Sequence, residues 1–230
     1  MHNTLPIETA RLILVPLKAE HVTAFGAGRQ ALSALLGVEV PPEWPVSPES
    51  LTCWQGRPEK LGQAGGWAAY LFIHRQDGIL VGDGGFKGRP DSAGEVEIGY
   101  ALVPAYRGRG LATEAARALA DLAFEQPEVT GLCAETLTDG YASMRVVQKL
   151  GLTFDKLVHS QAEGDVFRWR ASQAEYFAFH HPDPLRPDTS ACGSASMQTE
   201  PFLGYTFDNS ELDKENRDDR RPGGPQQPVV

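Results

Sequence analysis

The chain has few cysteines and no long apolar stretch, and each shortage excludes a class of protein. Cysteine occurs three times in 230 residues, at Cys53, Cys133 and Cys192. The odd number and wide spacing argue against a disulfide framework and a metal knuckle, so no metal site is expected. No apolar run approaches the ~18 residues of a membrane span, and the N-terminus lacks a basic segment followed by an apolar core. We therefore expect a cytoplasmic protein without a membrane partner.

Basic side chains are also in short supply. Lys and Arg together number 21 against 30 Asp and Glu, which gives a formal net charge of −9. This balance argues against a general nucleic-acid surface and mildly favours cationic or amine partners. Part of the excess acid lies near the C-terminus. The length fits one domain with a full core plus an appendage.

The hydrophobic pattern predicts an α/β fold with a mixed sheet. Apolar runs predict strands at residues 11–15, 67–74, 79–86, 95–103, 132–136, 153–158 and 166–169. Helical spacing predicts helices at residues 21–25, 29–36, 113–124 and 142–150. Helices therefore separate some of the strands but not others. The proline-rich pattern at residues 37–66 is looser, with a helical turn expected at 49–54, and this segment is a plausible wall for a substrate.

The composition changes after His181. Proline, serine and glycine are frequent at first, and residues 208–221 are a dense mixture of both charges. Such segments cannot bury enough apolar surface to fold. We therefore predict a domain over residues 1–181 and a disordered tail over 182–230, in which the aromatic stretch 201–207 could dock on the domain or on a partner.

The stretch Tyr106–Thr113 joins a predicted strand to a predicted helix and reads Tyr-Arg-Gly-Arg-Gly-Leu-Ala-Thr. Two glycines one residue apart allow a tight turn, and the helix that follows directs the positive end of its dipole at the same place. The chain has no Gly-Lys-Ser/Thr of a nucleotide-triphosphate loop. Thr113 also stands where a dinucleotide fingerprint requires its third glycine. The stretch therefore predicts a phosphate site of another kind.

The segment Arg107-x-x-Gly110-x-Ala112 resembles the acetyl-CoA signature of the GNAT superfamily of N-acetyltransferases. Glu97-Ile98-Gly99-Tyr100 before it and the run from Ser143 to Leu152 after it follow in the order of the RimJ/RimL-like branch. With the opening run from Glu8 to Leu14, the resemblance covers roughly residues 7–170. It implies a GNAT fold, with a mixed, mostly antiparallel central sheet whose splayed strands are flanked by helices. It also implies acetyl-CoA as co-substrate.

The same resemblance implies which residues contact the co-substrate. Main-chain N–H groups from Gly108 to Thr113 would hold the CoA pyrophosphate. The pantetheine arm would pair with the strand that ends at Leu102 and Val103, where one N–H would face the thioester carbonyl. The predicted cofactor-binding residues are Leu102, Val103, Arg107, Gly108, Arg109, Gly110, Leu111, Ala112 and Thr113.

Acetyl transfer to an amine requires a base for the amine and a proton for the departing thiolate. Glu97 matches the family's acidic residue before Ile-Gly-Tyr, although a carboxylate there could also orient the amine or form an ordinary ion pair. Ser143 matches the branch's serine, which could protonate the thiolate, although a serine there could instead cap its helix. The family commonly carries Asn two or three residues earlier, and Asp139-Gly140-Tyr141 contains none. Tyr141 is therefore the alternative hydroxyl.

The leading hypothesis is an acetyl-CoA-dependent N-acetyltransferase that acts on a primary amine by direct attack. The resemblance makes a protein N-terminal α-amine the first candidate acceptor and a small-molecule amine the second. The alternative hypothesis is a catalytically weak CoA-binding sensor that uses the C-terminal tail to reach a partner. The sequence leaves the oligomeric state open and is compatible with a homodimer.

Overall fold

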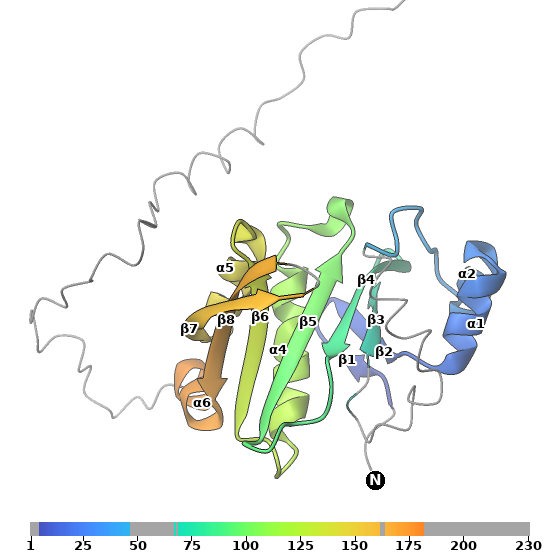
Figure 1. Ribbon diagram of the computed structural model, residues 1–230. Coiled ribbons are helices and arrows are strands. Elements are labelled where there is room, and N and C mark those ends of the chain that lie inside the picture. Colours follow the sequence, from blue (N-terminus) through green and yellow to red (C-terminus); the bar gives the residue numbers. More distant parts are fainter. Residues whose placement is uncertain (1–4, 47–66, 68, 162–163, 182–230) are drawn as a thin grey trace, which may run out of the picture. The chain divides into compact units, whose positions relative to one another are not determined.

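Two groups of antiparallel strands meet at one short parallel contact. The computed structural model describes residues 5–46, 67, 69–161 and 164–181, all within one compact unit. Its eight-stranded sheet has the order β1-β2-β3-β4-β5-β6-β8-β7 (Figure 1). The strands are β1 (Ile7–Glu8), β2 (Leu12–Pro16), β3 (Ala69–His74), β4 (Ile79–Phe86), β5 (Glu95–Leu102), β6 (Gly131–Leu137), β7 (Thr153–Ser160) and β8 (Gly164–Ser172). The sheet is mixed and mostly antiparallel, as the sequence predicts.

The parallel contact between β5 and β6 is short. Only Glu95–Glu97 pair with Gly131–Cys133. Further along, β5 continues to pair with β4 as far as Leu102, and β6 continues to pair with β8 as far as Leu137. Each strand thus follows its own antiparallel partner, and the ends of β5 and β6 diverge (Figure 1). We call this divergence the splay.

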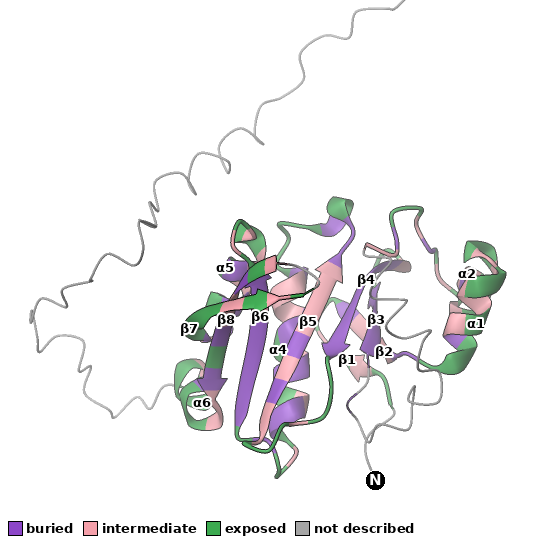
Figure 2. Ribbon diagram, in the orientation of Figure 1, coloured by how far each residue is buried: buried purple, intermediate pink, exposed green. Residues whose placement is uncertain are grey.

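The helices in the described part of the chain are α1 (Ala19–Ala27), α2 (Arg29–Leu36), α4 (Leu111–Phe124), α5 (Tyr141–Lys149) and α6 (Gln173–His180). Helix α4 packs on β5, and its buried stripe consists largely of alanine. Small side chains let the helix approach the sheet closely. Strand β5 has buried and half-buried stretches (Figure 2). Val96 and Ile98 are almost fully buried, and the period of two places Glu95 and Glu97 on the opposite face.

Strand β4 needs glycine where it lies against β5. A Cβ at Gly82 would come within 2.2 Å of the Ala101 carbonyl oxygen, and one at Gly84 within 2.5 Å of the Gly99 carbonyl oxygen. Any larger residue would push the two strands apart. The glycines therefore keep β4 close to β5.

Most predicted elements are present, and the differences have identifiable causes. The predicted helix at 21–25 extends over Ala19–Ala27, and the strand at 166–169 extends over Gly164–Ser172. Helix α6 was not predicted, although Ser172 and Glu175 form a capping box that its sequence signature could have revealed. Strand β1 is too short to leave a periodic signal. The helical turn predicted at 49–54 lies outside the described residues, and the domain boundary after His181 stays a prediction.

Candidate active site

The loop before α4 has the geometry of an anion site. Gly108 and Gly110 have φ of 71° and 77°, a left-handed conformation that glycine adopts without strain. Gly110 is the N-cap of α4, and no side chain caps the helix start among the described residues. A Cβ at Gly108 would meet no atom within 4 Å. The first N–H groups of α4, from Leu111 on, have no partner within the helix, so the loop fits a phosphate group.

The two loop arginines have other contacts besides a prospective anion. Arg107 Nε donates to the Leu102 carbonyl at 2.9 Å, which joins the loop to the end of β5. The guanidinium carbon of Arg109 lies 4.7 Å from the centre of the Tyr106 ring, a cation–π arrangement. Both side chains stay at the exposed surface beside the loop. Their positive charge is therefore available to an anion held there.

Arg11 forms hydrogen bonds with the loop and with α4. The sequence did not indicate this role. Its Nη1 donates to the Arg109 carbonyl at 2.8 Å, and its Nε donates to Glu114 Oε2 at 2.7 Å. Thr9 Oγ1 also donates to Glu114, at 2.6 Å. Burial alone would raise the pKa of Glu114, but the hydrogen bonds from Thr9 and Arg11 outweigh it and lower the pKa. Glu114 thus joins the N-terminal segment to α4 and does not serve as a base.

The main chain at the end of β5 distinguishes the two residues predicted to contact pantetheine. The Val103 N–H donates to the Val81 carbonyl at 2.9 Å, and the Val103 carbonyl accepts from the Tyr106 N–H at 3.0 Å. Of the two N–H groups that could face the thioester, the Val103 N–H is therefore already bonded to β4. In an antiparallel pair successive N–H groups alternate in direction, so the Leu102 N–H points toward the splay.

Glu97 lies at the last register position at which β5 and β6 pair. Its Oε1 is buried, and no described donor makes a directional hydrogen bond to it. The Lys87 ammonium nevertheless contacts this oxygen as an ion pair. Lys87 Nζ also lies 3.6 Å from Glu135 Oε2 on β6. Glu97 is thus a carboxylate at the base of the splay that is in direct contact with an ammonium.

Glu95, one period earlier on the same face, has a different environment. Its carboxylate contacts Arg168 and lies 3.4 Å from Arg170 Nε, both on β8. Arg168 also reaches Glu135 at 3.6 Å. This network neutralises Glu95 and joins β5 to β8 across β6. The structure therefore favours Glu97 over Glu95 as the available base.

Tyr100, which the sequence motif contained without a role, joins β5 to the start of α5. Its hydroxyl donates to the Ser143 carbonyl at 3.2 Å, and burial raises the pKa of this phenol. Tyr100 and Glu97 lie on opposite faces of β5, because they are three residues apart. Glu97 and Ser143 therefore lie on opposite sides of this strand.

The two hydroxyl candidates differ in position. Ser143 is the third residue of α5, whose N-cap is Gly140, so the alternative that Ser143 caps the helix is wrong. Tyr141 is the first residue of α5, and its side chain is 56% exposed. Both belong to the turn of α5 that Tyr100 fixes beside β5.

Cys133, Trp44 and Trp67 are buried and have packing roles. Cys133 is buried on β6, where burial and then the nearby Glu95 raise the pKa of its thiol. A neutral buried thiol is a poor nucleophile. Trp44 and Trp67 belong to the core, and Trp44 packs edge-to-face on Phe25 of α1 at 5.2 Å. Trp54 lies outside the described residues.

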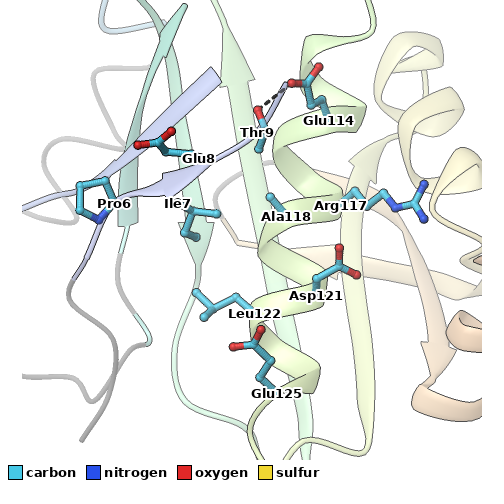
Figure 3. A pocket seen from close by; sticks show the side chains of 10 residues that line it. All are labelled: Pro6, Ile7, Glu8, Thr9, Glu114, Arg117, Ala118, Asp121, Leu122 and Glu125. Atoms are coloured by element: carbon cyan, nitrogen blue, oxygen red, sulfur yellow. Dashed lines mark hydrogen bonds between the residues drawn. The ribbon is translucent and has the colours of Figure 1, made fainter. Parts of the chain in front are cut away.

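A pocket of about 500 Å³ lies elsewhere, between the N-terminal segment and the outer flank of α4 (Figure 3). Glu8, Glu114, Asp121 and Glu125 give it an acidic lining, interrupted by Arg117. Glu114 is bound by Arg11, and Asp121 accepts a hydrogen bond from the Tyr176 hydroxyl at 2.7 Å. Neither Glu97 nor the glycines of the anion loop line this pocket. It is therefore separate from the candidate active site.

A sheet that splays beside a glycine-rich helix start, with a carboxylate at the base of the splay, is typical of acyltransferases that use coenzyme A thioesters. A family model described as "Acetyltransferase (GNAT) domain" matches residues 11–153. The chain belongs to this GNAT acetyltransferase family, and acetyl-CoA is its co-substrate.

Relatives agree with this assignment. The Bacillus subtilis (strain 168) protein called uncharacterized N-acetyltransferase YjdG is 30% identical over 161 residues, which cover 68% of this chain and 93% of the relative. A structure of RimL, the ribosomal L7/L12 α-N-protein acetyltransferase, in complex with coenzyme A aligns with a TM-score of 0.55 at 20% identity, covering 73% and 98% of the two chains. An acetyltransferase from Agrobacterium tumefaciens str. C58 aligns with a TM-score of 0.52 at 24% identity, covering 75% and 97%. The two structures support the fold alone.

The helices were also compared with the length and hydropathy that a bilayer requires. None in the described part of the chain is both long enough and apolar enough to cross a membrane.

Proposed function

We propose that this acetyltransferase transfers the acetyl group to a primary amine by direct attack, with Glu97 as the base. The observation that carries the proposal is the Glu97 carboxylate, whose buried Oε1 has an ammonium beside it and no directional hydrogen bond from a described donor. The carboxylate thus already holds one ammonium at the base of the splay. A bound amine would take the place of this ammonium beside Glu97 and then lose a proton to it.

The reaction divides between the two sides of β5. The neutral amine forms a C–N bond to the thioester carbonyl, and its proton passes to Glu97 directly or through water. The Leu102 N–H, which points toward the splay, is the candidate donor to the developing oxyanion. The C–S bond then breaks, and the thiolate takes a proton from the Ser143 or Tyr141 hydroxyl at the start of α5. The N–H groups from Gly108 to Thr113 hold the pyrophosphate, with Arg107 and Arg109 beside them.

A protein N-terminal α-amine is the first candidate acceptor, and a small amine is the second. The order of the RimJ/RimL-like motifs supports the α-amine, and the α-N-protein activity in the name of RimL agrees with it. An α-amine also has a lower ordinary pKa than a lysine side chain, near 8 rather than about 10.4. A larger share is therefore neutral and ready to attack at physiological pH. The wide spacing of the three cysteines supports a cytoplasmic location.

Thioester consumption with a panel of N-terminal peptides and small amines tests the proposal. Glu97→Gln should lower turnover by about 10²-fold or more, because the base is lost, while calorimetry should show unchanged acetyl-CoA affinity. Glu95→Gln is the matched control on the same strand and face. It should lower stability through its lost contacts with Arg168 and Arg170, but leave turnover per folded molecule near that of the wild type.

Two outcomes would contradict the proposal. The proposal is wrong if the wild-type protein binds no acetyl-CoA and consumes no thioester with any amine. Acetyl-CoA binding without turnover of any amine would instead favour the CoA-binding sensor. Robust wild-type turnover would exclude that sensor.

A further inference from the structure

Lys87 lies beside the proposed base through the register of the sheet. It directly follows β4, and its N–H donates to the Glu97 carbonyl at 2.9 Å. The two residues are therefore neighbours across the β4–β5 pair, and their side chains share a face of the sheet. This is the face on which an acceptor amine would reach Glu97.

The Lys87 side chain runs along β5 toward the splay. A Cβ at Gly99, two residues beyond Glu97, would lie 3.8 Å from Lys87 Cε. The lysine stem thus passes over Gly99 at van der Waals distance from the strand. Its Nζ then contacts Glu97 on β5 and lies 3.6 Å from Glu135 on β6. The ammonium thus sits between the two strands just where they begin to separate.

The lysine is accessible from solvent. Its side chain is 51% exposed, whereas the side chains of its partners Glu97 and Glu135 are only 21% and 15% exposed. The two carboxylates therefore hold the ammonium at the splay while much of the lysine stem stays open to solvent. A primary amine on a flexible four-carbon stem is therefore held beside a base at the position that the acceptor would use.

We propose that Lys87 is a site of self-acetylation, modified within the same molecule from bound acetyl-CoA. The inference rests on the proposed function, because it uses the same base and the same donor. Glu97 takes a proton from Nζ, the neutral amine forms an amide bond with the acetyl carbonyl, and the C–S bond breaks. CoA leaves as the thiolate, and the second proton that the nitrogen loses converts it to the thiol. The product has no charge at Nζ, so acetylation also frees Glu97 from its ion pair.

The test is acetyl-CoA alone with the full-length protein, followed by peptide mass spectrometry. Lys18 is a matched internal control, because its side chain is 54% exposed and its Nζ lies 3.6 Å from Glu20. Uncatalysed acetylation should modify both lysines at similar rates. Proximity to a base and a bound thioester should make Lys87 faster by about tenfold or more. The rate per molecule should not change with protein concentration, since the reaction occurs within one chain.

Two variants separate catalysis from exposure. Glu97→Gln should lower the rate at Lys87 to that at Lys18, with circular dichroism confirming that the variant is folded. Lys87→Arg keeps the positive charge, so it should abolish acetylation at this position while leaving acetyl-CoA affinity unchanged.

Failure of this inference can be told apart from failure of the proposed function. If the wild type acetylates amines from the panel while Lys87 is modified no faster than Lys18, self-acetylation is wrong and the transferase stands. A rate per molecule that rises with protein concentration would also overturn it, because one copy would then be modifying another. If neither Lys87 nor any panel amine is acetylated, both proposals fail.

Discussion

Two carboxylates on one face of the sheet have contrasting surroundings. Glu97 lies beside an ammonium at the base of the splay, whereas Asp83 on β4 is 3% exposed and covered by Trp44. The Trp44 indole Nε1–H donates to Asp83 Oδ2 at 2.8 Å. Burial raises the pKa of Asp83 to about 6, and the bond from Trp44 only partly opposes this. A carboxylate thus has a structural role at Asp83 and a proposed chemical role at Glu97.

Asp83 should make the folded protein less stable as pH rises. Its pKa is about 6 in the folded state and 3.8 ordinarily, so the folded state holds the proton more tightly. The free energy of unfolding should therefore fall by roughly 2 kcal/mol from this group between pH 4 and pH 7, at about 1.4 kcal/mol per pKa unit. Asp83→Asn cannot ionise and still offers an oxygen to Trp44. Denaturation at both pH values measures the free energy of unfolding of the variant and of the wild type. The variant should be more stable relative to the wild type at pH 7 than at pH 4. The same difference in stability at both pH values would contradict the assignment.

Gly108→Ala should weaken acetyl-CoA binding. Its φ of 71° costs an L-residue about 1–2 kcal/mol, and the added methyl group would project into the open space where a phosphate would lie. We expect the Kd for acetyl-CoA, measured by calorimetry, to rise about tenfold. Gly88→Ala is the control, because a Cβ there also meets no atom within 4 Å and its backbone does not require glycine. If both variants bound acetyl-CoA with equal affinity, the loop would not be part of the binding site.

At the scale of elements, one hydrogen-bonded tie holds the N-terminal segment to α4. Glu114 Oε1 accepts from the Thr9 hydroxyl at 2.6 Å and from the Arg11 N–H at 2.7 Å, while Oε2 accepts from Arg11 Nε. All three donors come from Thr9 and Arg11, which lie between β1 and β2, so the carboxylate joins this segment to α4.

Glu114→Gln should destabilise the protein by about 2 kcal/mol, since charge-assisted bonds are lost and an amide N–H₂ faces a donor. Urea denaturation measures the loss. The hydrogen bonds lower the pKa of Glu114 below 4.5, so its stabilisation is present above that pH and lost as pH falls through the folded-state pKa. The deficit of the variant should therefore shrink in acid. Glu125→Gln, at the exposed end of the same helix, should change stability by less than about 0.5 kcal/mol.

The elements show which signals a sequence carries. Apolar periodicity was enough for β3, β4, β5 and α4, whose buried faces are long and regular. It was not enough for Tyr100, whose bond to the Ser143 carbonyl depends on how far β5 and α5 are apart. Nor could it show that β4 takes the Val103 N–H, because a strand's hydrogen-bonding direction depends on its register. Spacing therefore predicted the strand, the loop and the helix that follow one another from β5 to α4, while contacts between distant elements required coordinates.

At the scale of the whole molecule, the site uses residues from β4, β5, β6, α4 and α5, all of which precede His181. A chain that ends at His181 should therefore fold and bind acetyl-CoA with unchanged affinity and melting temperature. Calorimetry on the shortened and full-length chains checks this. Loss of binding in the shortened chain would show that residues 182–230 contribute to the domain, contrary to the predicted boundary.

Because β5 and β6 pair only briefly, the stability of the sheet should depend on whether the donor is bound. Three register pairs join the two groups of strands, and beyond them the Leu102 N–H has no strand beside it among the described residues. An extended pantetheine arm lying there would act as a temporary additional strand. The protein should therefore be most resistant to unfolding when the donor is bound, and it should lose this reinforcement each time CoA departs.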